Sequence, residues 1–361
     1  MRTYKRKLRL TKSQEDRISS WIGSCRCVYN MGLEIKNKSY QLTGKSIHRF
    51  ELQKQITSIR DIPWMKDVPI HSLQYPLLRL ERSFENFFRT HKKGGGYPKF
   101  ASKRKFNSIH FPDPVSVSEN TVKIPKLGSL KMFKDSPIVG EIKTASIKIE
   151  PTGFFISITC DNVPKKFVSE NQTIGLDMGI SHFCIDSNGE FISNPRHFKK
   201  YERRLRIENR SLSRKKKRSS GWKKQTKRLA KLHHKIANVR KDFLHKESTK
   251  IAKKNNLVIM EDLNVSGMSR NKKLSKHILD CGWSMFRSMM EYKTNVVLVN
   301  AAYTSQTCNM CGVVDSSSRE SQSHFCCSSC GHTDNADVNA AKNIMRSGTP
   351  LKRKRKEVSY A

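Results

Sequence analysis

Acidic residues and long apolar runs are scarce in this sequence of 361 residues. Only 31 Asp and Glu accompany 70 Lys and Arg, which gives a formal net charge of +39. A charge of this size repels itself unless a polyanion neutralises it, so nucleic acid is the expected partner. No apolar run approaches the roughly 18 residues of a membrane-spanning helix, and residues 1–14 lack the apolar core of a signal peptide. We therefore expect a cytoplasmic protein with no membrane partner.

Cysteine is too sparse for a disulfide scaffold, because the chain has ten in 361 residues. Five of them stand among apolar residues and are expected to be small buried side chains: Cys25, Cys27, Cys160, Cys184 and Cys281. The other five fall within 23 residues. Four of these form the pairs Cys308-x-x-Cys311 and Cys327-x-x-Cys330, the spacing of a zinc ribbon with four thiolate ligands. Because the chain supplies all four ligands, the predicted Zn²⁺ is structural, and the adjacent Cys326 lacks the correct spacing to Cys330.

The first half of the chain changes character twice. Alternating residues in 1–10 indicate a strand, and apolar residues at helical spacing follow in 11–92, where Pro76 is expected to begin a helix. Residues 97–165 carry mostly strand patterns. Within residues 97–111, aromatic and basic residues are interleaved. This mixture fits a nucleic-acid surface and equally a half-buried strand with a basic outer face.

Residues 199–246 carry the highest concentration of positive charge. They contain 20 Lys or Arg and three acidic residues, have helical propensity, and are interrupted near Gly221. A charge run is usually a solvated face, but a face this one-sided would repel itself. We therefore predict a pair of helices that binds phosphate groups.

Three acidic segments lie far apart in the sequence. Asp177 belongs to a strand pattern between Gly175 and Gly179, whose missing side chains are expected to leave space for a metal ion and a phosphate backbone. Glu261 and Asp262 follow a continuous apolar strand, at the end where parallel sheets place ligand chemistry. One of these two acids is expected to be functional.

The third acid, Asp337, stands near the start of a predicted helix, where a structural helix cap would also explain an acidic residue. Cleavage of a phosphodiester by two Mg²⁺ ions about 4 Å apart requires oxygen ligands from separate segments to converge. We predict that Asp177, Glu261 and Asp337 are the catalytic acids and bind the two ions, in the order found in RNase H-like nucleases. The cysteine pairs just upstream are predicted to hold the Asp337 helix against the sheet.

Five motifs in this order resemble the split RuvC-like nuclease and zinc ribbon of transposon-encoded TnpB proteins, relatives of compact type V CRISPR effectors: GLDMGI, VIMEDLNVSGM, YTSQTCNMCG, CSSCGH and DVNAAKNI. The resemblance implies a Mg²⁺-dependent, RNA-guided endonuclease in a prokaryotic cytoplasm, associated with the nucleoid. Its implied partners are a guide RNA from the transposon end and target double-stranded DNA, cut beside a short motif. Base pairing would then supply specificity. The resemblance also implies Asp177, Glu261 and Asp337 as catalytic residues and the four paired cysteines as zinc ligands.

The resemblance further implies an α+β multidomain fold, in which an RNase H-like (RuvC) α/β nuclease domain contains the zinc ribbon. A β-barrel wedge domain would contain an inserted helical recognition lobe. The implied parts are the first wedge strand 1–10, recognition lobe 11–95, remaining wedge barrel 96–168, nuclease domain 169–303 with the basic helical insertion 199–246, zinc ribbon 304–335, final nuclease helix 336–346 and disordered basic tail 347–361.

Other functions remain possible from the sequence alone. A cleavage-deficient, guide-dependent DNA-binding protein acting as a repressor would normally have lost one of the acids. A DNA-strand transposase would carry a His-x-His pair, which this sequence lacks. Residues 294–302 are shorter than the family pattern, which fits either a trimmed loop or a degenerate transposon copy, and this leaves activity open.

Overall fold

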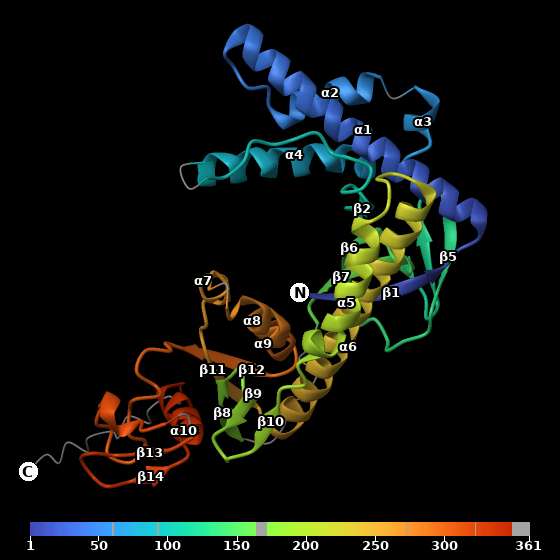
Figure 1. Ribbon diagram of the computed structural model, residues 1–361. Helices are drawn as coiled ribbons and strands as arrows, with labels where there is room; N and C mark the ends of the chain where they lie inside the picture. Colours follow the sequence, from blue (N-terminus) through green and yellow to red (C-terminus); the bar gives the residue numbers. More distant parts are fainter. Residues whose placement is uncertain (60, 92–93, 164–171, 272, 322, 349–361) are drawn as a thin grey trace, which may run out of the picture. The chain divides into compact units, whose positions relative to one another are not determined.

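The computed structural model describes residues 1–361 except 60, 92–93, 164–171, 272, 322 and 349–361 (Figure 1). The chain divides into two compact units, Met1–Pro164 and Lys165–Ala361. Each unit has its own hydrophobic core. Among the described residues, no helix combines the length and apolarity needed to cross a membrane.

The helices of the first unit are α1 (Lys12–Thr43), α2 (Arg49–Ser58), α3 (Pro63–Lys66) and α4 (Ile70–Thr90). Helix α1 begins with a capping box, in which Thr11 and Gln14 each accept a hydrogen bond from the other's backbone N–H. The residue after its end, Gly44, is the C-terminal cap, and its φ of 66° lies in the left-handed region. Helices α1 and α4 pack closely at Gly32, where a Cβ would lie 2.6 Å from Leu77 Cδ2.

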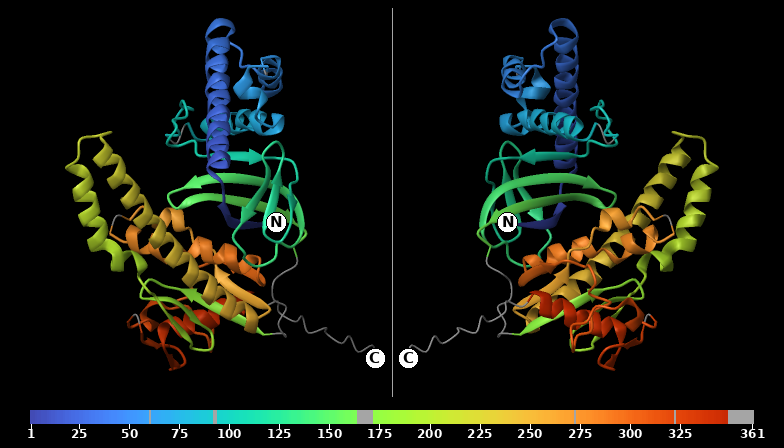
Figure 2. Two further views of the ribbon diagram at one scale, coloured as in Figure 1. Left: turned by 90° about the vertical axis from the view of Figure 1, so that its right-hand side faces the viewer. Right: turned by 90° about the vertical axis from the view of Figure 1, so that its left-hand side faces the viewer.

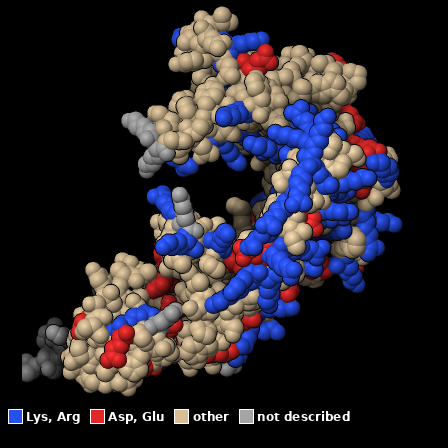
Figure 3. All heavy atoms as spheres, viewed as in Figure 1, with Lys and Arg blue, Asp and Glu red and all other residues tan. Residues whose placement is uncertain are grey.

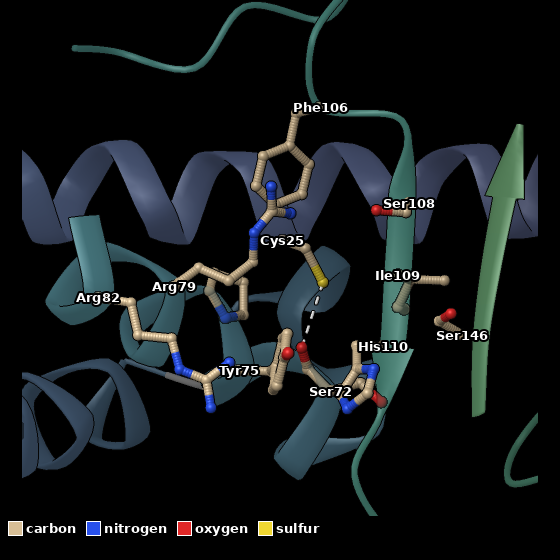
Figure 4. A pocket seen from close by; sticks show the side chains of 11 residues that line it. Cys25, Ser72, Tyr75, Arg79, Arg82, Phe106, Ser108, Ile109, His110 and Ser146 are labelled. Carbon is tan, nitrogen blue, oxygen red and sulfur yellow. Dashed lines mark hydrogen bonds between the residues drawn. The ribbon is translucent and has the colours of Figure 1, made fainter. Parts of the chain in front are cut away.

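The prediction that Pro76 begins a helix is wrong. Helix α4 begins at Ile70, directly after Pro69, so Pro76 lies inside it. Proline has no N–H to donate to the carbonyl of Ser72, four residues earlier. The thiol of Cys25 on α1 donates to this carbonyl oxygen at 3.4 Å (Figure 4). A contact between α1 and α4 therefore replaces the missing helical hydrogen bond.

The β-structure of the first unit is a seven-stranded antiparallel sheet in the order β2-β6-β7-β1-β5-β4-β3. Tyr4, Arg6 and Leu8 of β1 are buried and alternate with exposed residues, which confirms the strand predicted at 1–10. The strands are β1 (Arg2–Arg9), β2 (Ser108–Phe111), β3 (Ser116–Val117), β4 (Thr121–Ile124), β5 (Gly128–Met132), β6 (Glu141–Glu150) and β7 (Gly153–Asp161).

The composition of residues 97–111 allowed a half-buried strand or a surface for nucleic acid, and the segment has both buried and exposed aromatic rings. Phe106 and Phe111 are buried in the core of the first unit. Tyr97 and Phe100 are exposed. Phe111 belongs to the half-buried strand β2, Phe106 lies just before it, and the exposed rings of Tyr97 and Phe100 lie on the surface.

The second unit contains a five-stranded sheet in the order β10-β9-β8-β11-β12. Strands β8, β11 and β12 are parallel, and β9 pairs antiparallel with both β8 and β10. The short segment 295–299 pairs with β11 along its whole length, so it completes this sheet as an edge strand. The strands are β8 (Thr173–Met178), β9 (His182–Asp186), β10 (Phe191–Ser193), β11 (Leu257–Glu261) and β12 (Asn295–Val299).

Two long basic helices connect β10 to β11. Helices α5 (His197–Ser213) and α6 (Ser220–Lys254) lie side by side as an antiparallel hairpin (Figure 2), and they share a small core of Leu205, Leu232 and Ile236. The helical prediction for 199–246 is confirmed, with the interruption at residues 214–219. Lys and Arg side chains gather over this hairpin (Figure 3).

The second unit also contains the helices α7 (Val265–Met268), α8 (Ser275–Cys281), α9 (Trp283–Glu291) and α10 (Ala336–Gly348), the short 3-10 helix η2 (Ser316–Ser318), and a two-stranded antiparallel sheet of β13 (Phe325–Cys326) and β14 (Thr333–Asp334). Helix α10 continues two residues beyond the predicted end at 346. Residues 347 and 348, predicted to begin a disordered tail, are therefore helical. The rest of the predicted tail, 349–361, lies outside the described residues.

Candidate functional site

Asp177, Glu261 and Asp337 line one cavity of about 310 Å³ in the second unit. Asp177 lies near the end of β8, and Glu261 is the last residue of β11. These strands are parallel neighbours, so their carboxyl ends lie at the same edge of the sheet. Asp337 comes from the first turn of α10, which packs on β8. The structure thus brings together the three acids named from the sequence, here called the acidic site.

Gly175 has a different role from the one predicted. A Cβ at this position would lie 2.2 Å from the carbonyl oxygen of Ala341 and 2.7 Å from Cβ of Met345, both on α10. The missing side chain therefore makes room for α10, and the prediction that it clears space for an ion and a phosphate is wrong. The close approach of α10 to β8 brings Asp337 to the same cavity as Asp177.

Two carboxylates of the acidic site, those of Asp177 and Glu261, have a raised pKa. Burial, followed by the negative charges of Glu261 and Asp337, raises the pKa of Asp177 to about 7. Burial also raises the pKa of Glu261, although a hydrogen bond from Thr304 opposes this shift. Clustered, buried carboxylates are unfavourable unless a cation balances them. Carboxylate oxygens are also the ligands that Mg²⁺ prefers, so this donor set fits divalent ions.

Neighbouring residues distinguish the two acids that follow β11. Glu261 Oε1 accepts a 2.6 Å hydrogen bond from the hydroxyl of Thr304. Asp262 instead forms an ion pair with Arg287, with 2.6 Å between Oδ1 and Nη1. Glu261 is therefore the acid of this pair that lines the cavity.

Two residues that contact the acids in this cavity, Thr304 and Arg319, were not identified from the sequence. Nη2 of Arg319 lies 2.8 Å from Oδ1 of Asp337, and its positive charge opposes the rise in the pKa of Asp177. Arg319 lies between the two cysteine pairs, in a segment without a recognisable spacing. Thr304 stands in the quoted motif YTSQTCNMCG, but the motif alone does not show that its hydroxyl reaches β11.

The start of α10 explains why Asp337 is not the helix cap. Asn335 Oδ1 accepts hydrogen bonds from the N–H groups of Asp337 and Val338, at 3.0 and 3.3 Å. The capping position is therefore filled by Asn335. The carboxylate of Asp337 is left to pair with Arg319 and to line the cavity.

Cys308, Cys311, Cys327 and Cys330, here called the cysteine cluster, bring their sulfur atoms within 4.8 Å of one another. The Cys308–Cys330 and Cys311–Cys327 sulfur distances are 3.7 and 3.6 Å. Four thiolates around Zn²⁺ at about 2.3 Å place neighbouring sulfurs about 3.8 Å apart, so the arrangement fits a tetrahedral zinc site. The backbone N–H of Cys330 donates a 3.5 Å hydrogen bond to Sγ of Cys327, a contact that favours a thiolate.

A second cavity, of about 350 Å³, lies within the first unit between α4 and β2 (Figure 4). Its lining includes Arg79 and Arg82, together with Tyr75 and His110, whose ring centroids are 3.9 Å apart. Burial and the two arginines lower the pKa of His110, so this imidazole is neutral at pH 7. Guanidinium groups beside aromatic rings are typical of surfaces that bind nucleic acids.

Three family models match parts of the chain. Residues 155–272 match a family described as "Probable transposase", and residues 283–344 match "Cas12f1-like, TNB domain". Residues 1–45 match a model described as "Helix-turn-helix domain". In this structure the last region forms strand β1 and one uninterrupted helix, α1.

Two bacterial proteins align with nearly the whole chain. "Putative RNA-guided DNA endonuclease InsQ" of Escherichia coli (strain K12) is 31% identical over 374 residues, covering 96% of this chain and 92% of that protein. "Putative RNA-guided DNA endonuclease" of Streptomyces pristinaespiralis is 29% identical over 362 residues, covering 96% and 89%. A chain in "Cryo-EM structure of the Cas12f1-sgRNA-target DNA complex" has a similar α+β fold, with a TM-score of 0.57 at 16% identity over 94% of this chain and 83% of that one.

Proposed function

Because the chain belongs to the transposon-encoded TnpB family, we propose that it is an RNA-guided endonuclease that cleaves double-stranded DNA beside a short motif. The observation that carries this proposal is the convergence of Asp177, Glu261 and Asp337 on one cavity. A guide RNA from the transposon end and target DNA would neutralise the formal charge of +39. Base pairing with the guide would select the target, while the protein contacts the nucleic-acid backbone.

The three carboxylates of the acidic site would hold two Mg²⁺ ions. When bound, these ions supply Lewis acidity and stabilise the negative charge that develops during phosphodiester hydrolysis. The hydroxyl of Thr304 fixes one oxygen of Glu261 and leaves the other available as a ligand. Arg319 balances the charge of Asp337, and its guanidinium group would be available to a phosphate bound in the same cavity.

The cysteine cluster would hold a structural Zn²⁺, and its backbone connections would stabilise the region around α10. We also propose a finer division of the fold. Residues 1–10 and 96–168 would form the wedge β-barrel, and the recognition lobe 11–95 would be an insertion between these two parts. The nuclease domain would comprise 169–303 and the final helix, with the zinc ribbon at 304–335.

A cleavage assay on the assembled complex tests this function. The protein is purified from cells that express the transposon end, its bound RNA is sequenced, and a plasmid with the matching target is incubated with the complex and Mg²⁺. Wild type is expected to linearise the plasmid, whereas Asp177→Ala is expected to reduce the rate at least about 100-fold, since it removes a metal ligand.

Asp262→Ala provides the matched control, because this acid pairs with Arg287 instead of lining the cavity. It is expected to retain most of the activity. Equal cleavage by wild type and Asp177→Ala would exclude the proposed site. An intact plasmid that is nevertheless bound through the correct guide would support the non-cleaving, repressor-like function instead.

A further inference from the structure

Two buried asparagines on α10 hold the segment that connects β12 to the cysteine cluster. Asn339 and Asn343 are 0% and 6% exposed. The Nδ2 group of Asn343 donates to the carbonyl oxygens of Thr304 and Thr307, at 3.0 and 2.6 Å. The Nδ2 group of Asn339 donates to the same Thr307 oxygen at 2.8 Å, and its Oδ1 accepts from the backbone N–H of Asn309 at 2.9 Å. Each asparagine side chain is therefore hydrogen-bonded to two backbone groups of residues 304–309.

Packing alone does not explain these amides. The buried face of α10 is otherwise mainly apolar, with Ala336, Val338, Ala340, Ala341 and Ile344. A buried amide is unfavourable unless its polar atoms are hydrogen-bonded, and here the bonds go to one short segment. Because Asn339 and Asn343 are four residues apart, they lie on the same face of the helix. Through these two side chains, α10 holds the backbone of residues 304–309 in one conformation.

The segment held in this way leads directly to the acidic site. Thr304 is 8% exposed, and its hydroxyl donates to Glu261 Oε1 at 2.6 Å. The preceding residue, Tyr303, has a φ of 64°, a left-handed conformation that is unfavourable for a side chain of this size. Its carbonyl oxygen accepts hydrogen bonds from the N–H groups of Gln306 and Thr307, both at 3.0 Å. The turn that orients Thr304 is thus strained and depends on its surroundings.

We propose that Asn343 is a positioning residue that acts through Thr304 to keep Glu261 in register with Asp337 for divalent-ion binding. Asn343 and Asp337 belong to the same helix, so one rigid element sets the position of both carboxylates. Asn339 links this element to the cysteine cluster through Asn309. The inference rests on the proposed nuclease function, and it adds a connection between the acidic site and the zinc ribbon.

Three variants test the connection. Asn343→Leu preserves the approximate volume and removes both hydrogen bonds, Thr304→Val removes the hydroxyl, and Thr304→Ser retains it. Binding of Mn²⁺ to the guide-loaded protein is measured by electron paramagnetic resonance, and cleavage is measured against Mg²⁺ concentration. Loss of a residue that orients a metal ligand typically weakens metal binding or activity about 10–100-fold, and we expect this range for Asn343→Leu and Thr304→Val.

Thr304→Ser is expected to bind Mn²⁺ within about threefold of wild type. The double variant Asn343→Leu/Thr304→Val is expected to lose little more than the worse single variant, because both changes act on the same carboxylate. All variants should retain one zinc per chain and bind guide RNA normally. These last two measurements separate the proposed effect from loss of the zinc ribbon or of guide loading.

Asn255→Leu is the matched control for a purely structural effect. Asn255 is also buried, at 5% exposure, but its side chain bonds to the carbonyl of Ile251 at the end of α6. It should reduce thermal stability without changing Mn²⁺ affinity. If Asn343→Leu and Thr304→Val behave like Asn255→Leu, the positioning role is excluded. If wild type binds Mn²⁺ but does not cleave, the nuclease proposal fails, while the Mn²⁺ affinities still decide the role of Asn343.

Discussion

Asp177 shows how the acidic site affects the stability of the protein. Its pKa is raised from 3.8 to about 7, chiefly by burial and then by the charges of Glu261 and Asp337. Between these pKa values the folded protein binds more protons than the unfolded chain, so the free energy of unfolding falls as the pH rises. One pKa unit corresponds to about 1.4 kcal/mol, which makes the full effect on the order of 4 kcal/mol. Without divalent ions, an ionised acidic site therefore destabilises the fold above neutral pH.

Replacing Asp177 with Asn removes this destabilisation together with the metal ligand. In buffer without divalent ions, Asp177→Asn is expected to unfold with a higher free energy than wild type at pH 8, by up to about 4 kcal/mol. The difference should shrink to roughly half at pH 5.5, because wild-type Asp177 is then mostly protonated in the folded state. Urea denaturation at both pH values measures the change. A variant that is less stable than wild type at pH 8 would contradict this account.

The acids after β11 show what sequence reasoning could not resolve at a single position. Both Glu261 and Asp262 follow the predicted strand, and the strand pattern alone indicates only that one of the two is functional. The choice between them depends on Thr304 and Arg287, which lie 43 and 25 residues away along the chain. The strand pattern alone therefore narrows the site to two adjacent acids. The family motif selects Glu261, and the tertiary contacts explain why Glu261 is the acid that lines the cavity.

At the level of secondary-structure elements, features with local causes were predictable. The capping box of α1 and the apolar strand before Glu261 are each specified by a few neighbouring residues. Pro76 and Gly175 were misinterpreted because their partners are distant in sequence: Cys25 for the Ser72 carbonyl, and α10 for the glycine. The hydrogen bonds of Asn343 to residues 304 and 307 also join parts of the chain that are distant in sequence, so local patterns do not reveal them.

The proline in α4 supports a prediction about the packing of that helix with α1. Cys25→Ala leaves the Ser72 carbonyl without the thiol donor and should lower the free energy of unfolding by about 1–3 kcal/mol. In the Pro76→Ala background, residue 76 has an N–H that can donate to this carbonyl. Cys25→Ala should therefore lower the free energy of unfolding clearly less in that background. Urea denaturation, combined with hydrogen exchange of α4 peptides, measures both steps. Equal losses in the two backgrounds would show that the thiol does not substitute for the helical hydrogen bond.

For the whole molecule, charge is the dominant property. The +39 formal charge is distributed over both units, and the α5–α6 hairpin displays one dense part of it (Figure 3). Surface charges interact over a screening length of about 10 Å at 0.1 M salt, which shortens as salt is added. Self-repulsion of the free protein should therefore weaken with rising ionic strength. Binding of a polyanion should produce the same stabilisation at low salt, by linkage to the folded state.

We accordingly expect the thermal unfolding midpoint of the RNA-free protein to rise by several degrees between 50 and 300 mM NaCl, and the rise to disappear once guide RNA is bound. Replacing Lys215, Lys216 and Lys217 with Gln should raise the midpoint at 50 mM NaCl and reduce its salt response, because these three exposed lysines lie together in the loop between α5 and α6.

Lys12, Lys38 and Lys246 provide the control, because each forms an ion pair with a carboxylate four residues away. Their replacement by Gln lowers the net charge equally but also removes favourable pairs, so it should raise the midpoint less. A midpoint that falls with added NaCl would show that attractive surface pairs outweigh the excess positive charge. The nucleic-acid partner would then not be needed to relieve repulsion, and its effect on stability would have to come from specific contacts alone.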